Sequence, residues 1–265
     1  GYPADTRTRE AFLSIEATAI RGATRSVFVT PGAARFYRAR YADLDPSRFL
    51  VIENGFDEET FAAVEQAGDR TAPINAGKIT LLHSGVVYPT ERDPTQFFGA
   101  LKALLDSKTI SPNRLNIRFR APGHEGMLRE MVARFSLGAL IEILPSIPYR
   151  DAIAEMLRAD GLLIMQGASC NDQIPAKLYE YLRARRPLIG LVDPKGDTAS
   201  AMRAAGIDGI AALESKAEIE ALLLRALPML AARNLAIPNV NAVETGSRLG
   251  RTRQLGAVLD DVVDR

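Results

Sequence analysis

The stretch that decides the fold runs from Gly161 to Val192 and reads GLLIMQGASCNDQIPAKLYEYLRARRPLIGLV. It begins with a short apolar run at Gly161–Met165, continues through a helical pattern at Pro175–Leu182, and ends with a second apolar run at Pro187–Val192. A strand, a helix and another strand in this order predict a βαβ unit with parallel strands. The second run is almost continuously apolar, which is typical of a strand covered on both faces.

The same alternation extends along the chain in both directions. Further strands are predicted at Val27–Thr30, Phe49–Ile52, Ile79–His83, Leu115–Phe119, Leu140–Leu144 and Ile210–Leu213. Helical patterns occupy Arg9–Ile20, Leu128–Phe135, Asp151–Leu157 and Ala199–Ala205, and Asp93-Pro94 supplies a helix start. The predicted fold class is therefore α/β: a Rossmann-like, doubly wound parallel sheet with helices on both faces.

Composition narrows the class of protein further. The 33 basic and 32 acidic residues give a formal net charge of +1, which argues against a dedicated nucleic-acid binder. One cysteine, Cys170, excludes an internal disulfide and favours a cytoplasmic location, and with only two histidines a zinc site is not expected. No stretch approaches the ~18 apolar residues of a membrane span, and no signal-peptide pattern opens the chain.

Three parts are expected from the distribution of patterns. Residues 1–77 hold too few strands for a domain of their own and are predicted to be the trailing segment of another domain plus a linker, which we place at Glu58–Ala76. Residues 78–240 form the compact Rossmann-like domain. Residues 241–265 are expected to form an amphipathic C-terminal helix.

Ligands of open α/β sheets bind outside the carboxyl ends of the strands, so the loops after strands are the informative ones. In the first such loop, Gly85 allows close approach of a ligand to the backbone, and Arg92 precedes a helix start, where an anion would meet free N–H groups. A tight turn with a solvated arginine explains this loop equally well. The loop has neither the dinucleotide-binding nor the P-loop glycine pattern.

The next two loops carry weaker signals. His124 stands between two glycines before a helix, where it would touch a phosphate or a base, or simply cap the helix at the surface. The loop around Ile147 ends in Pro148, which fixes an extended backbone able to present polar groups to a base edge, or alternatively a plain turn into the next helix.

The fourth loop, Gln166–Ile174, is the most specific. Pro175 suits the first helical position, so the N–H groups around Ile174, Ala176 and Lys177 would point into the cleft. Glu180 follows within the helix, where a carboxylate aimed at the cleft can hold a ribose diol. The alternative is a surface helix decorated with lysine and glutamate.

Taken in order, these motifs resemble the C-terminal, donor-binding half of retaining GT-B glycosyltransferases of the "group 1" kind, family four. The resemblance covers roughly Val27 to Ile210. It rests on Asn54-Gly55-Phe56-Asp57, on Ser84-Gly85 with Arg92-Asp93-Pro94, on Pro175–Leu182 with Arg186–Ile189, and on an acid pair formed by Asp172 and Glu180.

The resemblance implies sugar transfer, of the hexosyltransferase type, from a nucleotide-sugar donor with retention at the anomeric carbon and without a metal or other cofactor. Arg92 and Asp172 would be catalytic, Arg92 by neutralising the leaving diphosphate. The donor would contact Gly85, Arg92, His124, Ile147, Ile174, Pro175, Ala176, Lys177 and Glu180. The acceptor, a sugar or a lipid-linked glycan, would be held by a domain that this chain nearly lacks. That domain could also make a peripheral contact at the inner face of the membrane.

The sequence departs from the family pattern at two places. A basic residue expected after Gly85 is Val86, and the glycine pair of the second loop has become Pro122-Gly123-His124, so that Arg120 or His124 would have to supply the missing cation. The alternatives are a non-catalytic nucleotide-sugar-binding module, a sugar-nucleotide epimerase-like domain and a purely structural module. We expect this chain alone to be inactive, and its C-terminal helix to favour self-association.

Overall fold

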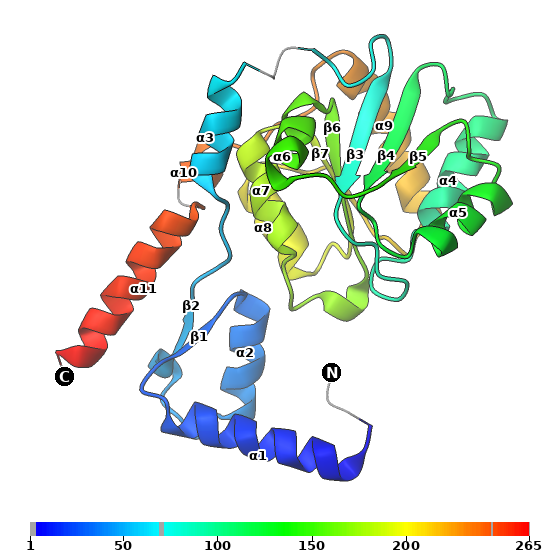
Figure 1. The fold of residues 1–265 in the computed structure, drawn as a ribbon. Coiled ribbons are helices and arrows are strands. Elements are labelled where there is room, and N and C mark those ends of the chain that lie inside the picture. Colours follow the sequence, from blue (N-terminus) through cyan, green and yellow to red (C-terminus); the bar gives the residue numbers. More distant parts are fainter. Residues whose placement is uncertain (1–3, 69–71, 245, 265) are drawn as a thin grey trace.

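The computed structural model describes residues 4–68, 72–244 and 246–264, and its centre is a six-stranded sheet (Figure 1). The strands, all paired in parallel, lie in the order β5-β4-β3-β6-β7-β8. Their bounds are β3 Ile79–Ser84, β4 Leu115–Arg120, β5 Ile141–Leu144, β6 Gly161–Gln166, β7 Leu188–Val192 and β8 Ile210–Ala211. This is the strand order of a dinucleotide-type Rossmann sheet, and it reverses direction between β3 and β6.

Helices cover both faces of the sheet, as predicted. One face packs on α4 (Thr95–Asp106), α5 (Glu125–Arg134) and α9 (Lys216–Ala231). The other face packs on α3 (Glu58–Gln66), α6 (Tyr149–Arg158), α7 (Ala176–Ala184) and α8 (Asp197–Ala204). Alternate strand residues supply the two cores: Leu81 faces the first set of helices and Leu82 the second, both with no exposed surface. The α/β, doubly wound prediction is therefore confirmed.

The helix α3 is a departure from the sequence analysis, which placed a linker at Glu58–Ala76. Asp57 caps this helix by accepting from the N–H groups of Glu59 and Thr60, at 3.1 and 3.3 Å. Phe61 and Val64 then lie three positions apart on one face of the helix and are buried beside α6 and α7. The burial of these two apolar side chains packs this otherwise polar helix against α6 and α7.

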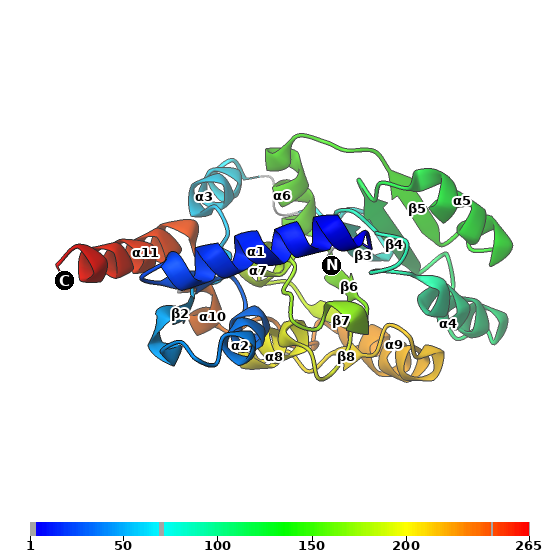
Figure 2. The same ribbon diagram turned by 90° about the horizontal axis from the view of Figure 1, so that it is seen from below.

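The N-terminal segment, residues 4–54, lies beside the sheet lobe, residues 56–68 and 72–244. It contains α1 (Thr6–Gly22), α2 (Pro31–Arg40), a 3₁₀ turn η1 (Pro46–Arg48), and a two-stranded parallel sheet of β1 (Ser26–Phe28) and β2 (Phe49–Val51). After the short α10 (Val240–Glu244), α11 (Arg248–Val263) runs back from the sheet lobe toward this segment (Figures 1 and 2).

The chain crosses between the two parts twice, and the two crossings pair with each other. The Phe56 N–H donates to the Gly246 carbonyl at 3.1 Å, and the Arg248 N–H donates to the Phe56 carbonyl at 2.8 Å. Gly55 is required here, because a Cβ atom would lie 2.7 Å from the Gly246 carbonyl oxygen. The two crossings therefore form one narrow connection.

The described residues contain neither a membrane-spanning helix nor a cluster of metal-ligating side chains. Within 4–68, 72–244 and 246–264, no helix has the length and apolar character of a membrane span. Over the same residues, no three or more histidine, cysteine, aspartate or glutamate side chains are grouped as a metal site would require.

Candidate functional site: a pocket at the carboxyl ends of β3 and β6

A pocket of about 220 Å³ lies where the strand order reverses, at the carboxyl ends of β3 and β6. Ligands of doubly wound sheets bind at this position, because the loops there diverge to opposite faces and leave a crevice. Its lining comes from the end of β3 and the loop after it, from β6, and from the start of α7. The lining residues are His83, Ser84, Gly85, Val86, Tyr88, Arg92, Ile164, Met165, Pro175, Ala176 and Lys177.

Gly85 and Arg92 form the side of the pocket contributed by the β3 loop. Gly85 has a φ of +137°, a backbone conformation that residues with a Cβ rarely adopt. Its N–H donates to the Arg120 carbonyl at 2.9 Å, which extends the β3–β4 pairing by one residue. The Arg92 guanidinium donates to the Val86 carbonyl at 2.5 Å and lies 5.3 Å from the centroid of the Tyr88 ring, so the loop holds this cation at the pocket wall.

Lys177 forms the opposite side, and Glu180, which is not part of the lining, pairs with it on α7. Pro175 occupies the N-cap and α7 begins at Ala176, one residue later than the sequence pattern predicts. The Lys177 Nζ lies 2.7 Å from Glu180 Oε2, an ion pair between residues three apart on the helix. Glu180 is 9% exposed, and its Oε1 accepts a 2.9 Å hydrogen bond from the Tyr149 hydroxyl. Burial, together with this carboxylate, raises the pKa of Tyr149, so the phenol stays a proton donor.

Two buried residues, one in the pocket lining and one bonded to it, have no role in the sequence analysis. His83 is 3% exposed, and its Nδ1 lies 2.9 Å from the Leu163 carbonyl, to which it donates as the neutral tautomer. Burial lowers the pKa of His83 to about 4. Tyr181 accepts a 2.7 Å hydrogen bond from the Ser84 N–H and ties α7 to the end of β3. The sequence could have indicated His83, because this residue stands at the end of a predicted strand. No sequence pattern near Tyr181 indicates its contact with Ser84.

Besides Glu180, four predicted site residues lie outside the lining of this pocket. Ile174 is buried in the core beneath α7, so only its backbone faces the loop. His124 is an exposed residue in the left-handed conformation (φ 39°) at the start of α5, with its ring centroid 6.5 Å from that of Tyr88. Ile147 lines a different pocket, of about 340 Å³, beside α6. Asp172 has a 62% exposed side chain outside the lining.

Asp172 instead faces the N-terminal segment. Its carboxylate lies 3.8 Å from the Arg35 guanidinium, and its carbonyl accepts from the Thr30 hydroxyl at 2.7 Å. The buried Asp197 accepts from the Gly32 N–H at 2.5 Å and from Arg35 at 2.9 Å. A Cβ on Gly32 would lie 2.4 Å from Asp172 Oδ1, so the start of α2 fits against these two acids only as glycine.

Arg120 does not reach the pocket. Its guanidinium donates to both oxygens of Glu155, at 2.8 and 2.9 Å, and to the Pro145 carbonyl at 2.9 Å. Arg118 shares the same carboxylate at 3.1 Å. Glu155 therefore fixes both arginines against α6. The second cation in the pocket is Lys177, a residue of the α7 motif, and not Arg120 or His124.

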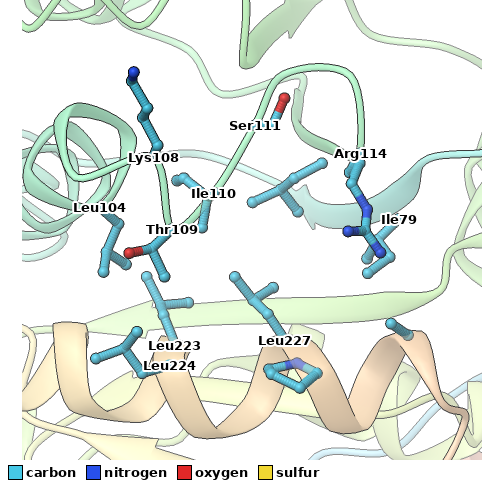
Figure 3. A pocket seen from close by; sticks show the side chains of 13 residues that line it. Ile79, Leu104, Lys108, Thr109, Ile110, Ser111, Arg114, Leu223, Leu224 and Leu227 are labelled. Carbon is cyan, nitrogen blue, oxygen red and sulfur yellow. The ribbon is translucent and has the colours of Figure 1, made fainter.

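A larger pocket, of about 490 Å³, lies between α9 and the end of α4 (Figure 3). Its walls are mainly aliphatic, with Leu223 and Leu227 of α9 pointing into it and Leu104 at one side, whereas Lys108 points away. It lies at the amino ends of β3 and β4. Its few polar groups and its distance from the strand carboxyl ends leave the smaller pocket as the candidate site.

No protein-family model and no curated protein matches this sequence. Solved structures share its fold at low identity. An α,α-trehalose-phosphate synthase (UDP-forming) from Burkholderia vietnamiensis is 15% identical with a TM-score of 0.72, and the alignment covers 99% of this chain and 64% of that one. Anabaena HepE in complex with UDP-glucose is 13% identical with a TM-score of 0.68, covering 97% and 68%. A glycosyltransferase from Rickettsia africae is 12% identical with a TM-score of 0.66, covering 99% and 69%.

These similarities show that the chain has the Rossmann-like α/β fold of one half of a GT-B protein, and its structural neighbours are GT-B glycosyltransferases. The chain spans 64% of the length of the trehalose-phosphate synthase. Because identity is low and coverage is partial, the shared fold leaves the activity, the substrates and the role of each residue to the proposal below.

Proposed function

We propose that this chain is the donor-binding part of a retaining glycosyltransferase that uses a nucleotide sugar. The observation that carries the proposal is the pocket at the β3/β6 reversal, which brings Gly85, Arg92, the start of α7 and Lys177 together. A loop with a glycine at positive φ, two cations and a helix N-terminus on one small crevice suit a diphosphate. One structural neighbour, Anabaena HepE, is solved in complex with UDP-glucose, which supports the same class of ligand.

In this proposal the donor lies across the pocket with its diphosphate between Arg92 and Lys177. Glu180 accepts from the ribose hydroxyls, and the Tyr149 hydroxyl holds that carboxylate in place through its 2.9 Å hydrogen bond. The sugar faces the backbone at Pro175 and Ala176, which line the pocket, whereas Ile147 and Asp172 lie outside it and are given no donor contact. His124, at the rim beyond Tyr88, contacts the outer edge of the donor.

The reaction breaks the bond between the anomeric carbon and the diphosphate oxygen and forms a bond on the same face to an acceptor hydroxyl, whose proton passes to the departing diphosphate oxygen. Negative charge develops on the diphosphate while its bond to carbon breaks. Arg92, Lys177 and the free N–H groups at the start of α7 stabilise that charge, in the way that preorganised donors stabilise developing anions, without a resident metal. The proposed acceptor is a sugar or a lipid-linked glycan that is held largely outside this chain. We propose that the reaction takes place in the cytoplasm.

Turnover needs the acceptor held about 3–3.5 Å from the anomeric carbon in a site that excludes water. Among the described residues the N-terminal segment contributes nothing to the lining of the donor pocket, so we expect this chain by itself to bind nucleotides with negligible transfer. A non-catalytic nucleotide-sugar-binding module would behave identically here, and only a longer protein that still fails to transfer would favour it.

The test is a thermal-shift panel of nucleosides, nucleoside diphosphates and nucleotide sugars, followed by calorimetric titration of the best ligand. A ligand at 100 times its Kd adds about 2.7 kcal/mol of apparent stability. Glu180→Ala should weaken binding about ten-fold, since a lost charged hydrogen bond costs ~1.5–3 kcal/mol. Arg92→Ala should weaken diphosphates far more than nucleosides.

Arg129→Ala is the matched control, because this arginine is 60% exposed on α5 and pairs only with Glu125 among the described residues. It should bind as the unmodified chain does. A flat nucleotide panel, or equal losses of diphosphate and nucleoside affinity in Arg92→Ala, would contradict the proposal.

A further inference from the structure

A second polar pocket, of about 380 Å³, lies at the opposite end of the sheet from the candidate donor site. Asp160 and Pro187, which line it, immediately precede β6 and β7, whereas the donor pocket follows the carboxyl ends of β3 and β6. β6 contains six residues. At about 3.3 Å per residue, the two pockets are separated by roughly 20 Å.

Four arginines line this pocket: Arg158, Arg185, Arg186 and Arg233. Asp160 is the acidic residue among them, and its carboxylate already accepts the Thr80 N–H at 2.8 Å. Within residues 4–68, 72–244 and 246–264, none of the four arginines has an ion pair with a carboxylate. The chain as a whole is nearly neutral, with 33 basic and 32 acidic residues, so this concentration of one sign is local.

The protein holds these guanidinium groups with backbone carbonyls. Arg158 donates to the Ala72 carbonyl at 2.9 Å, Arg185 donates to the Pro238 carbonyl at 3.3 Å, and Arg186 donates to the Leu157 carbonyl. Each of these bonds uses one of the five N–H donors of an arginine, so most donors remain for a ligand.

Mutual repulsion among the arginines is visible at Arg186, which is half-buried. Burial lowers the pKa of its guanidinium; the Asp160 carboxylate opposes this effect, and Arg233 adds to it. A positive charge withdrawn from water beside a second positive charge is costly unless an anion joins them.

The C-terminal ends of three helices offset only part of the positive charge of these arginines. Arg158 ends α6, Arg185 is the C-cap of α7, and Arg233 lies just beyond the end of α9. Each helix C-terminus carries about half a negative charge, so three of them offset about one and a half positive charges. With Asp160 counted as well, about one and a half positive charges remain unbalanced.

We propose that this arginine pocket binds a phosphate monoester of a small molecule. A phosphate monoester carries about −1.5 to −2 at neutral pH, which matches the unbalanced charge, and its oxygens suit the paired donors of arginine. Leu230, Leu235 and Ile237 line the same pocket and would contact the carbon skeleton of the ester. This inference does not depend on the proposed glycosyltransferase function.

Calorimetric titration of this chain with glycerol 3-phosphate and with inorganic phosphate tests the proposal. Both should bind at millimolar concentration or below. Tighter binding of glycerol 3-phosphate assigns the site to an ester, and equal binding assigns it to the free anion, which corrects the ligand named here. Arg233→Gln, in an exposed residue, should weaken binding about ten-fold, and Arg158→Gln should do the same.

Two controls separate this pocket from other sources of affinity. Arg129→Gln removes a positive charge on α5 and should leave binding unchanged. Arg92→Ala, which removes a cation that the proposed donor site offers to a phosphate, should also leave it unchanged, so failure of one proposal is distinguishable from failure of the other. Absence of binding, an unchanged affinity in both arginine variants, or tighter binding of an oligonucleotide than of either small phosphate would overturn the proposal.

Discussion

The sheet lobe and the N-terminal segment are built from similar elements but bury very different fractions of them. In the sheet lobe, α7 alone buries six residues: Leu178, Tyr179, Glu180, Tyr181, Leu182 and Ala184. In contrast, α1 is nearly twice as long and buries none, while Phe12 and Ile15 on it are 47% and 66% exposed. β1 and β2 expose Val27 (41%) and Val51 (37%), and α11 buries no residue either.

This difference indicates where the folding free energy resides. Parallel strands are stable when both faces are covered, and the sheet lobe meets that condition with helices from its own sequence. The two-stranded sheet of the N-terminal segment has too few strands for independent stability and leaves apolar side chains in solvent. The segment is held mainly through polar contacts, such as those of Arg35 and Gly32 with Asp197.

The largest expected effect comes from truncating a phenylalanine side chain to alanine in the sheet lobe, compared with the same change in the N-terminal segment. Phe98 has no exposed surface, and its ring centroid lies 5.9 Å from that of Phe119 and 6.2 Å from that of Phe135. Phe98→Ala should lower the free energy of unfolding by ~3–5 kcal/mol, the cost of a buried aromatic cavity. Phe12→Ala should change it by less than about 0.5 kcal/mol. Urea denaturation followed by circular dichroism measures both, and comparable losses would refute the contrast between the two regions.

The second effect is a pH dependence of the free energy of unfolding, which arises from a histidine in the sheet lobe. Burial lowers the pKa of His83 to about 4, whereas an unfolded histidine titrates near 6.5. Between these two pKa values the histidine binds a proton in the unfolded chain but not in the folded chain. The free energy of unfolding therefore falls as the pH falls below about 6.5. From pH 7 to pH 5 the loss should be about 2 kcal/mol.

The protein supplies its own control for this effect, because His124 is the other histidine and is exposed. Urea denaturation at several pH values should show that His83→Gln removes most of the slope between pH 7 and pH 5, while His124→Gln retains it. The opposite pattern would mean that His83 is protonated in the folded protein.

The comparison also explains which parts of the fold the sequence could predict. Strands of the sheet lobe are short apolar runs, and each predicted run from Ile79 to Ile210 overlaps a strand, because burial on both faces leaves a local signal. The helices α2 and α9 were not predicted, and α3 was assigned to a linker. α3 has only Phe61 and Val64 as buried residues, and α9 is apolar around most of its circumference and contains Pro228, so its pattern is indistinct.

The candidate site likewise contains residues that the sequence could identify and contacts that it could not. Gly85, Arg92 and Lys177 could be named because each follows or begins an element that the sheet order brings to one edge. The hydrogen bond of Tyr149 to Glu180 and the capture of Arg120 by Glu155 depend on how α6 sits against the sheet, which no local pattern encodes. Ile174 was misplaced for a related reason: its neighbours face the loop while its side chain completes the core.

A third, smaller effect concerns the contact between the two regions. Asp197 has a 7% exposed side chain and accepts from both Gly32 and Arg35. Asp197→Asn removes the charge that these donors face and should cost about 1–2 kcal/mol. Hydrogen exchange should quicken in α2 and leave β3 and β6 unchanged. Asp208→Asn, at an exposed position, is the matched control. Equal exchange in both variants would show that the acid does not hold the segment.

The smallest expected effect is at the C-terminal helix. Leu255 and Leu259 on α11 are 41% and 56% exposed, and the helix is attached by ion pairs of Arg251 with Glu53 and of Arg25 with Asp261, each at 2.8 Å. Exposed ion pairs contribute about 0–1 kcal/mol, and exposed leucines lose little on substitution. A Leu255→Gln, Leu259→Gln double variant should therefore change the free energy of unfolding by less than about 0.5 kcal/mol at low protein concentration. If the apolar side of α11 is instead covered by a second copy of the chain, the loss will exceed that bound, will grow with protein concentration, and will coincide with a smaller mass in sedimentation equilibrium of the variant. Such a result would move α11 from the sparsely buried part of the molecule to an interface.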